Sequence, residues 1–174
     1  MRVSSEQPAL MFERVFTAAA EPLGLTEPPL DYGVMYEQFL FTYLLDHPDY
    51  LVPLHQPTTR VFCALLGVEY DGRKVTEGML ADSFLFTLGA FPKHLSTIYA
   101  RLGYDETAMR SQVYEHIRTL YLRSKNEQYK TQRVVIAEHV PLFVECSSRA
   151  LQHIRHSGTR EHLDDLFSQN LQEN

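Results

Sequence analysis

The sequence has little cysteine and no long apolar run, and both absences restrict what the chain can be. Its two cysteines, Cys63 and Cys146, lie far apart and outside any CxxC pattern. We therefore predict two free thiols in apolar surroundings, as a reducing cytoplasm allows. No segment approaches the roughly 18 apolar residues that a membrane helix needs. Polar residues also interrupt the N-terminal stretch where a signal peptide would lie, so we expect a soluble, cytoplasmic protein.

Motifs that identify an enzyme or a metal site directly are also missing. The sequence has no GxSxG motif, no HExxH motif and no Glu-x-x-His pair, and neither cysteine lies in a recognisable nucleophile motif. His153 and His156 are three residues apart, but a helical wheel places them on different faces. We therefore predict no cofactor and no metal site, and an enzymatic role is not favoured.

Basic residues are outnumbered, with 16 Lys and Arg against 22 Asp and Glu, and the net charge is −6. This balance argues against a nucleic-acid-binding surface and fits a protein or peptide partner that carries positive charge. The one basic stretch, Arg118 to Arg133, is interpreted as the solvated end of one helix and the start of the next, because cations complement the dipole at a helix C-terminus. The sequence leaves open whether the chain forms a homodimer.

What the sequence does contain is apolar residues at helical spacing, separated by short breaks of Pro, Gly, Asp or Thr. Little of it favours strands, apart from a small turn or hairpin at Asp71-Gly72. We therefore predict an all-α fold, a single-domain compact bundle of seven or eight helices over residues 1–174. A Pro- and Gly-rich loop is expected at 21–33. The expected helices span about 8–20, 34–46, 58–66, 76–88, 92–102, 105–123, 127–156 and 159–171.

Local signals mark several helix ends. Asp105 is a predicted N-cap, Pro92 is placed in a first turn, and Gly67 is expected to stop the helix before it. Capping boxes are predicted at Ser4–Gln7 and Ser124–Glu127. Nine aromatic residues fall between positions 32 and 91 and are interpreted most simply as core, with an aromatic-lined cavity as the alternative. They are Tyr32, Tyr36, Phe39, Phe41, Tyr43, Phe62, Phe84, Phe86 and Phe91.

The stretch AEHVPLFVEC, Ala137 to Cys146, combines an ionisable histidine with a helix-breaking proline. On a continuous wheel for 131–156, His139 shares an apolar face with Val135 and Phe143, while Pro141 faces the polar side. We expect a kinked helix, or two helices meeting in line. His139 is then a core histidine bonded to a nearby carbonyl, part of a ligand or peptide site, or a metal ligand. His116 is expected to lie on an apolar face in the same way.

Three segments are similar to those of a known family. EHVPLFVE (Glu138 to Glu145) resembles the Asp-His-Leu-Pro-type segment of the redox-enzyme maturation chaperones, the TorD/DmsD/NarJ group. LLDHPDYL (Leu44 to Leu51) resembles an opening common in the NarJ branch, and IYARLGYD (Ile98 to Asp105) resembles a piece of the TorD branch. In a second register, YEHI (Tyr114 to Ile117) takes the place of the acidic–His motif.

The resemblance implies a cytoplasmic chaperone that binds the N-terminal or twin-arginine signal peptide of a molybdenum oxidoreductase subunit until its cofactor is inserted. Glu138, His139 and Pro141 would then form part of the peptide-binding site, or Glu115 and His116 in the second register. Two alternatives stay open. One is a helical ligand- or metal-binding enzyme that uses His139 and His116, and the other is a generic helical regulatory or interaction module.

Overall fold

A computed structural model describes residues 7–70 and 72–154 of the chain. This part contains eight α-helices, two 3₁₀ helices and one short hairpin, which confirms the all-α prediction and its number of helices. The α-helices are α1 (Pro8–Ala20), α2 (Leu30–Asp46), α3 (Pro57–Leu66), α4 (Glu77–Ala90), α5 (Pro92–Arg101), α6 (Glu106–Arg123), α7 (Lys130–Glu138) and α8 (Val140–Gln152). The 3₁₀ helices are η1 (Glu21–Leu23) and η2 (Pro48–Tyr50), and the strands β1 (Glu69–Tyr70) and β2 (Arg73–Lys74) pair antiparallel.

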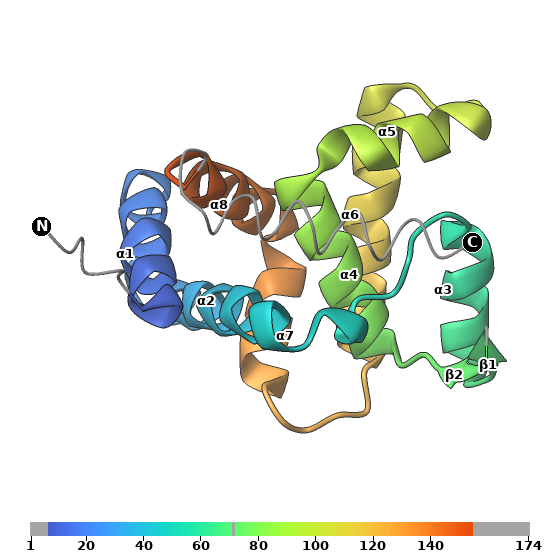
Figure 1. The fold of residues 1–174 in the computed structure, drawn as a ribbon, viewed down its shortest axis with the longest axis horizontal. Coiled ribbons are helices and arrows are strands. Elements are labelled where there is room, and N and C mark those ends of the chain that lie inside the picture. Colours follow the sequence, from blue (N-terminus) through green and yellow to red (C-terminus); the bar gives the residue numbers. More distant parts are fainter. Residues whose placement is uncertain (1–6, 71, 155–174) are drawn as a thin grey trace, which may run out of the picture.

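Helix α4 runs through the middle of the molecule (Figure 1). It packs against α3, α5, α6 and α8, while α1 and α2 pack on each other at one end of the bundle and α3 lies with the hairpin at the other. Twelve of its 14 residues are buried, from Gly78 to Ala90. A helix that is apolar on all sides belongs in the interior. A buried charged side chain on α4, such as Asp82, therefore needs a partner from a neighbouring element.

Most of the predicted helix ends are confirmed. The Asp105 carboxylate accepts a hydrogen bond from the Ala108 N–H at 2.8 Å and caps α6. Gly67 ends α3 with φ at 67°, in the left-handed region that glycine adopts without a steric penalty. Pro92 lies in the first turn of α5, and Gly72, with φ at 72°, lies between β1 and β2, while Asp71 of the predicted turn lies outside the described residues.

Other boundaries differ from the prediction. Helix α2 begins at Leu30, four residues earlier than expected, so the Pro- and Gly-rich loop is shorter. Ser124–Glu127 is not a capping box. The α6–α7 loop continues to Tyr129, whose φ of 61° precedes α7, and the Asn126 side chain bonds the Gln128 N–H instead. The predicted helix at 159–171 and the Ser4 capping box lie outside the described residues.

The bend at Pro141 separates two helices, and the predicted burial of His139 is wrong. His139 has φ −137° and ψ 36°, its carbonyl accepts the first backbone bonds of α8, and its side chain is exposed. Pro141 therefore lies in the first turn of α8, where a missing N–H costs nothing. The break resets the helical phase, so Val140 and Val144 face the core while Leu142 is exposed. A single wheel drawn across the break places Val140 and Val144 correctly on the apolar side but misplaces His139 and Leu142.

Candidate functional site

A groove with a volume of about 390 Å³ lies where α6 meets the α7–α8 junction. We call it the junction groove. Its floor contains the buried residues Ala137 and Val140. The residues that line it are Ser111, Tyr114, Glu115 and Arg118 from α6, with Ala137, Glu138, Val140 and Pro141 from the junction.

The junction groove brings together carboxylates from both predicted Glu–His pairs. Glu115 and Glu138 line it, as does Pro141, although Glu115 and Glu138 are 23 residues apart in the sequence. The two histidines are not among the lining residues. The predicted peptide-binding residues therefore divide into three that share a groove and two that do not.

The His116 side chain makes its contacts outside the junction groove. Its Nδ1 lies 3.2 Å from the Tyr99 hydroxyl and its Nε2 lies 3.0 Å from the Gln112 side-chain amide. Its ring also lies against Phe84, with 5.5 Å between ring centroids. Burial lowers the pKa of His116, which favours the neutral ring. This half-buried, hydrogen-bonded histidine matches the packing role predicted for it.

The charges of the junction groove are exposed. Glu115 faces Arg118 at 3.9 Å, and both side chains are more than half exposed, so this ion pair is weak and Glu115 can exchange partners. Glu138 is exposed as well. Across residues 7–70 and 72–154, no group of three or more His, Cys, Asp or Glu side chains is placed to hold a metal ion. What the groove offers is two carboxylates against one guanidinium, a net negative charge, above an apolar floor.

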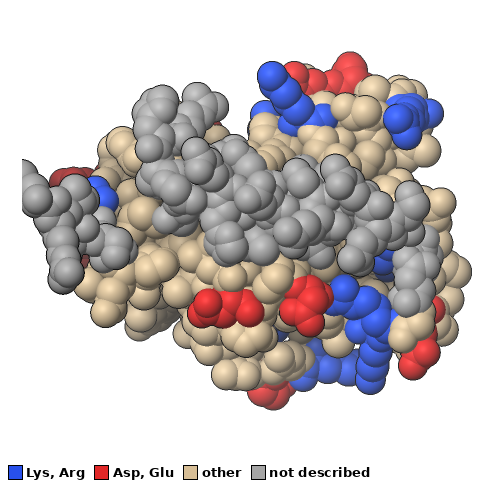
Figure 2. Space-filling model, viewed as in Figure 1, with Lys and Arg blue, Asp and Glu red and all other residues tan. Residues whose placement is uncertain are grey.

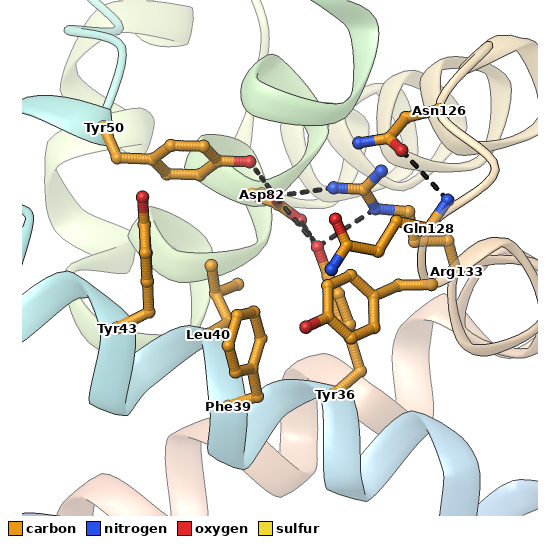
Figure 3. Close-up of a pocket in the computed structure, with 10 residues that line it drawn as sticks. Tyr36, Phe39, Leu40, Tyr43, Tyr50, Asp82, Asn126, Gln128 and Arg133 are labelled. Atoms are coloured by element: carbon orange, nitrogen blue, oxygen red, sulfur yellow. Dashed lines mark hydrogen bonds and ion pairs between the residues drawn. The ribbon is translucent and has the colours of Figure 1, made fainter.

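A second and more buried cluster surrounds Asp82, in the middle of α4. Asp82 has no exposed surface, and its carboxylate accepts hydrogen bonds from three tyrosine hydroxyls, of which those of Tyr36 and Tyr50 are drawn in Figure 3. Tyr121 donates at 2.6 Å, Tyr50 at 2.6 Å and Tyr36 at 2.8 Å. The Arg133 Nη2 lies 3.4 Å from the same carboxylate. A buried carboxylate needs such partners, because removing it from water without them is costly.

Arg133 completes the cluster from α7. It is 5% exposed; its Nε donates to the Tyr36 hydroxyl at 3.0 Å, and its guanidinium lies 5.4 Å from the Tyr36 ring centroid. Gly78 on α4 leaves room for this group, since a Cβ there would lie 3.0 Å from the Arg133 Nη1. Burial opposes the charge of Arg133, but the Asp82 carboxylate together with the Tyr36 and Tyr121 side chains outweighs it, so the guanidinium pKa is raised.

The three tyrosines act as hydrogen-bond donors. Burial raises the pKa of Tyr36, Tyr50 and Tyr121, and the negative charge of Asp82 raises each further. All three hydroxyls therefore keep their protons at neutral pH. The cluster joins α2, η2, α6 and α7 to the central helix through one carboxylate.

An open pocket of about 240 Å³ adjoins this cluster and is drawn in Figure 3. We call it the tyrosine pocket. It is predominantly aromatic on one side and polar on the other. Its lining residues are Tyr36, Phe39, Leu40, Tyr43, Tyr50, Asp82, Asn126, Gln128, Tyr129 and Arg133.

Another buried carboxylate joins α2 to α8. Glu37 has no exposed surface, and its Oε1 accepts a hydrogen bond from the Ser147 hydroxyl at 2.7 Å. Its Oε2 has no hydrogen-bond partner. Burial raises the pKa of Glu37 well above its ordinary value, so the protonated form is favoured. Cys146, beside it, is a buried free thiol, and Cys63 is free and half-buried, as the sequence predicted.

Sequence reasoning missed both buried carboxylates. For Asp82 there was a signal, because it interrupts the otherwise apolar run of α4, where a charge needs a partner. The alternative of an aromatic-lined cavity for residues 32–91 was closer to the observed structure, since Tyr36, Phe39 and Tyr43 do line a pocket. Nothing in the sequence pointed to Arg133, which lies in a stretch interpreted as solvated.

Comparison of the chain with known protein families, curated proteins and solved structures finds no match in any of the three. The resemblance to the maturation chaperones therefore stays a prediction. Within the described ranges, no helix has both the length and the apolar content needed to span a bilayer.

Proposed function

We propose that the protein is a cytoplasmic peptide-binding chaperone of the redox-enzyme maturation type. Its client is the N-terminal or twin-arginine signal segment of a molybdenum oxidoreductase subunit, and the junction groove is the binding site. The observation that supports this proposal is the convergence of Glu115 and Glu138, one from each Glu–His pair, on a single groove with an apolar floor.

The chemistry of the junction groove fits a basic peptide with apolar residues. Exposed carboxylates attract arginine side chains and set their orientation, while Ala137, Val140 and Pro141 offer apolar surface. The net charge of −6 adds a long-range attraction for a basic segment. His139 lies between Glu138 and Pro141 in the sequence and is exposed, so it is accessible to a peptide that reaches past the groove.

The direct test is fluorescence anisotropy with a labelled twin-arginine signal peptide and the full chain. Glu138→Gln and Glu115→Gln should each weaken binding by about 1.5- to 5-fold, because each exposed carboxylate contributes about 0.2–1 kcal/mol. Binding should also weaken as salt is raised. The matched control is Glu145→Gln, which removes an exposed carboxylate of α8 that is paired with Arg149 and lies outside the groove.

A second peptide with both arginines replaced by glutamine tests the charge argument. It should bind more weakly to the unmodified chain, and the two groove variants should lower its affinity less. If Glu145→Gln weakens binding as much as Glu138→Gln, the groove is not the site. If neither peptide binds at low salt, the chaperone proposal fails.

A further inference from the structure

We propose a second binding site, independent of the junction groove, in which Arg133 binds the carboxylate of a small aromatic acid. The site is the tyrosine pocket together with a neighbouring cavity of about 480 Å³. Tyr50, Asn126 and Arg133 line both spaces, so the two adjoin at these residues.

One N–H donor of the Arg133 guanidinium has no partner among the described residues, which indicates that a ligand binds beside it. The Nε and Nη2 of Arg133 are bonded to Tyr36 and Asp82, but its Nη1 is buried and has no hydrogen-bond partner. A buried N–H group of a charged side chain costs free energy when it is left unpaired. An acceptor oxygen on a ligand would satisfy it, and a carboxylate suits the planar guanidinium.

The surrounding charge selects an anion. The neighbouring cavity is lined by Lys74 and Lys125 as well as Arg133, against one acidic residue, Glu77. Figure 2 shows Lys and Arg side chains gathered at the lower right, between β2 and the α6–α7 loop of Figure 1. In a chain with a net charge of −6, this local excess of positive charge stands out. It favours negatively charged ligands over neutral ones.

Asp82 argues for a single negative charge. Its buried carboxylate lies 3.4 Å from the Nη2 of Arg133, so part of the guanidinium charge is already compensated. A dianion such as a phosphate monoester would be repelled by Asp82 at this depth, whereas a carboxylate brings one charge only.

The aromatic side chains of the tyrosine pocket indicate that the rest of the ligand is an aromatic ring. Phe39 is 41% exposed, although it lies 4.9 Å from Tyr129 and 5.7 Å from Tyr43, measured between ring centroids. This leaves an uncovered aromatic surface inside the tyrosine pocket. An engineered protein cavity of about 150 Å³ holds benzene. The 240 Å³ of the tyrosine pocket therefore accommodates one six-membered ring.

The test is an NMR titration of the ¹⁵N-labelled full chain with 4-hydroxyphenylacetate, which is ionised at pH 7. A ligand of this size should bind with a Kd of about 1–10 mM. The Arg133 Nε–Hε signal and the backbone amides of the α6–α7 loop should shift and saturate. The neutral amide, 4-hydroxyphenylacetamide, should bind at least about tenfold more weakly, because it cannot form the charge-assisted bond. Inorganic phosphate at equal concentration should not displace the acid.

Variants at the edge of the site leave the Asp82 cluster intact. Lys125→Gln should weaken binding about two- to fivefold, and Phe39→Ala should weaken it further. Lys93→Gln, on α5 and outside both cavities, should have no effect. Equal affinity for the acid and its amide would overturn the proposal. Displacement by phosphate, or shifts that map outside the two cavities, would overturn it as well.

Discussion

Replacing Asp82 with Asn tests whether the buried cluster stabilises the fold. The substitution keeps the size of the side chain but removes the negative charge that compensates Arg133, which is 5% exposed. Breaking a buried ion pair in this way costs about 3–5 kcal/mol, because the remaining charge is left buried without a partner. Typical domains have only about 5–15 kcal/mol of stability in total. The variant should therefore be close to unfolding.

Urea denaturation followed by circular dichroism gives the measurement. With a denaturant slope of about 2–3 kcal/mol per molar, the Asp82→Asn midpoint should fall by about 1–2.5 M. Tyr121→Phe removes one hydrogen bond to the carboxylate and should cost less, about 1.5–3 kcal/mol. Asp46→Asn changes an exposed carboxylate at the end of α2 and should stay within about 0.5 kcal/mol. An Asp82→Asn midpoint equal to that of Asp46→Asn would refute the reasoning.

Two further outcomes follow from the side chains of His139 and Glu37. His139→Ala should change the unfolding free energy by no more than about 0.5 kcal/mol, because the side chain is exposed; a loss of several kcal/mol in urea would restore the buried interpretation. For Glu37 the pKa is higher in the folded state than in the unfolded state, so the protein loses stability as the pH rises from about 4.5 towards the folded pKa. Glu37→Gln should remove this loss. When both proteins are unfolded in urea from pH 4 to pH 8, the stability of the variant relative to that of the unmodified chain should increase with pH. A difference that does not vary with pH would contradict the raised pKa.

Local features of the fold could be predicted from the sequence. Asp105, Gly67 and Pro92 act within one turn of the chain, so their types alone indicate where α6 begins, α3 ends and α5 begins. The α7–α8 region could not be predicted in the same way. The apolar spacing continues through Pro141, and a wheel assumes one uninterrupted helix, whereas His139 adopts a non-helical conformation.

The candidate sites were less predictable than the helices, because they depend on contacts between distant segments. Glu115 and Glu138 were both named from the sequence, yet their shared groove follows only from the packing of α6 beside the junction. Asp82 is 51 residues from Arg133 and 46 from Tyr36. Spacing along the chain carries no information about such pairs, and the aromatic side chains of α2 look alike whether they fill the core or line a pocket.

The position of Asp82 also affects local unfolding of the protein. α2, α6 and α7 each place a side chain on this one carboxylate. Separating any one of these helices from α4 would therefore break a hydrogen bond to Asp82 and weaken the cluster that holds the other two. Small fluctuations that free a single helix are therefore disfavoured. Backbone amides in these three helices should exchange with deuterium at a common slow rate, as members of one cooperative unit.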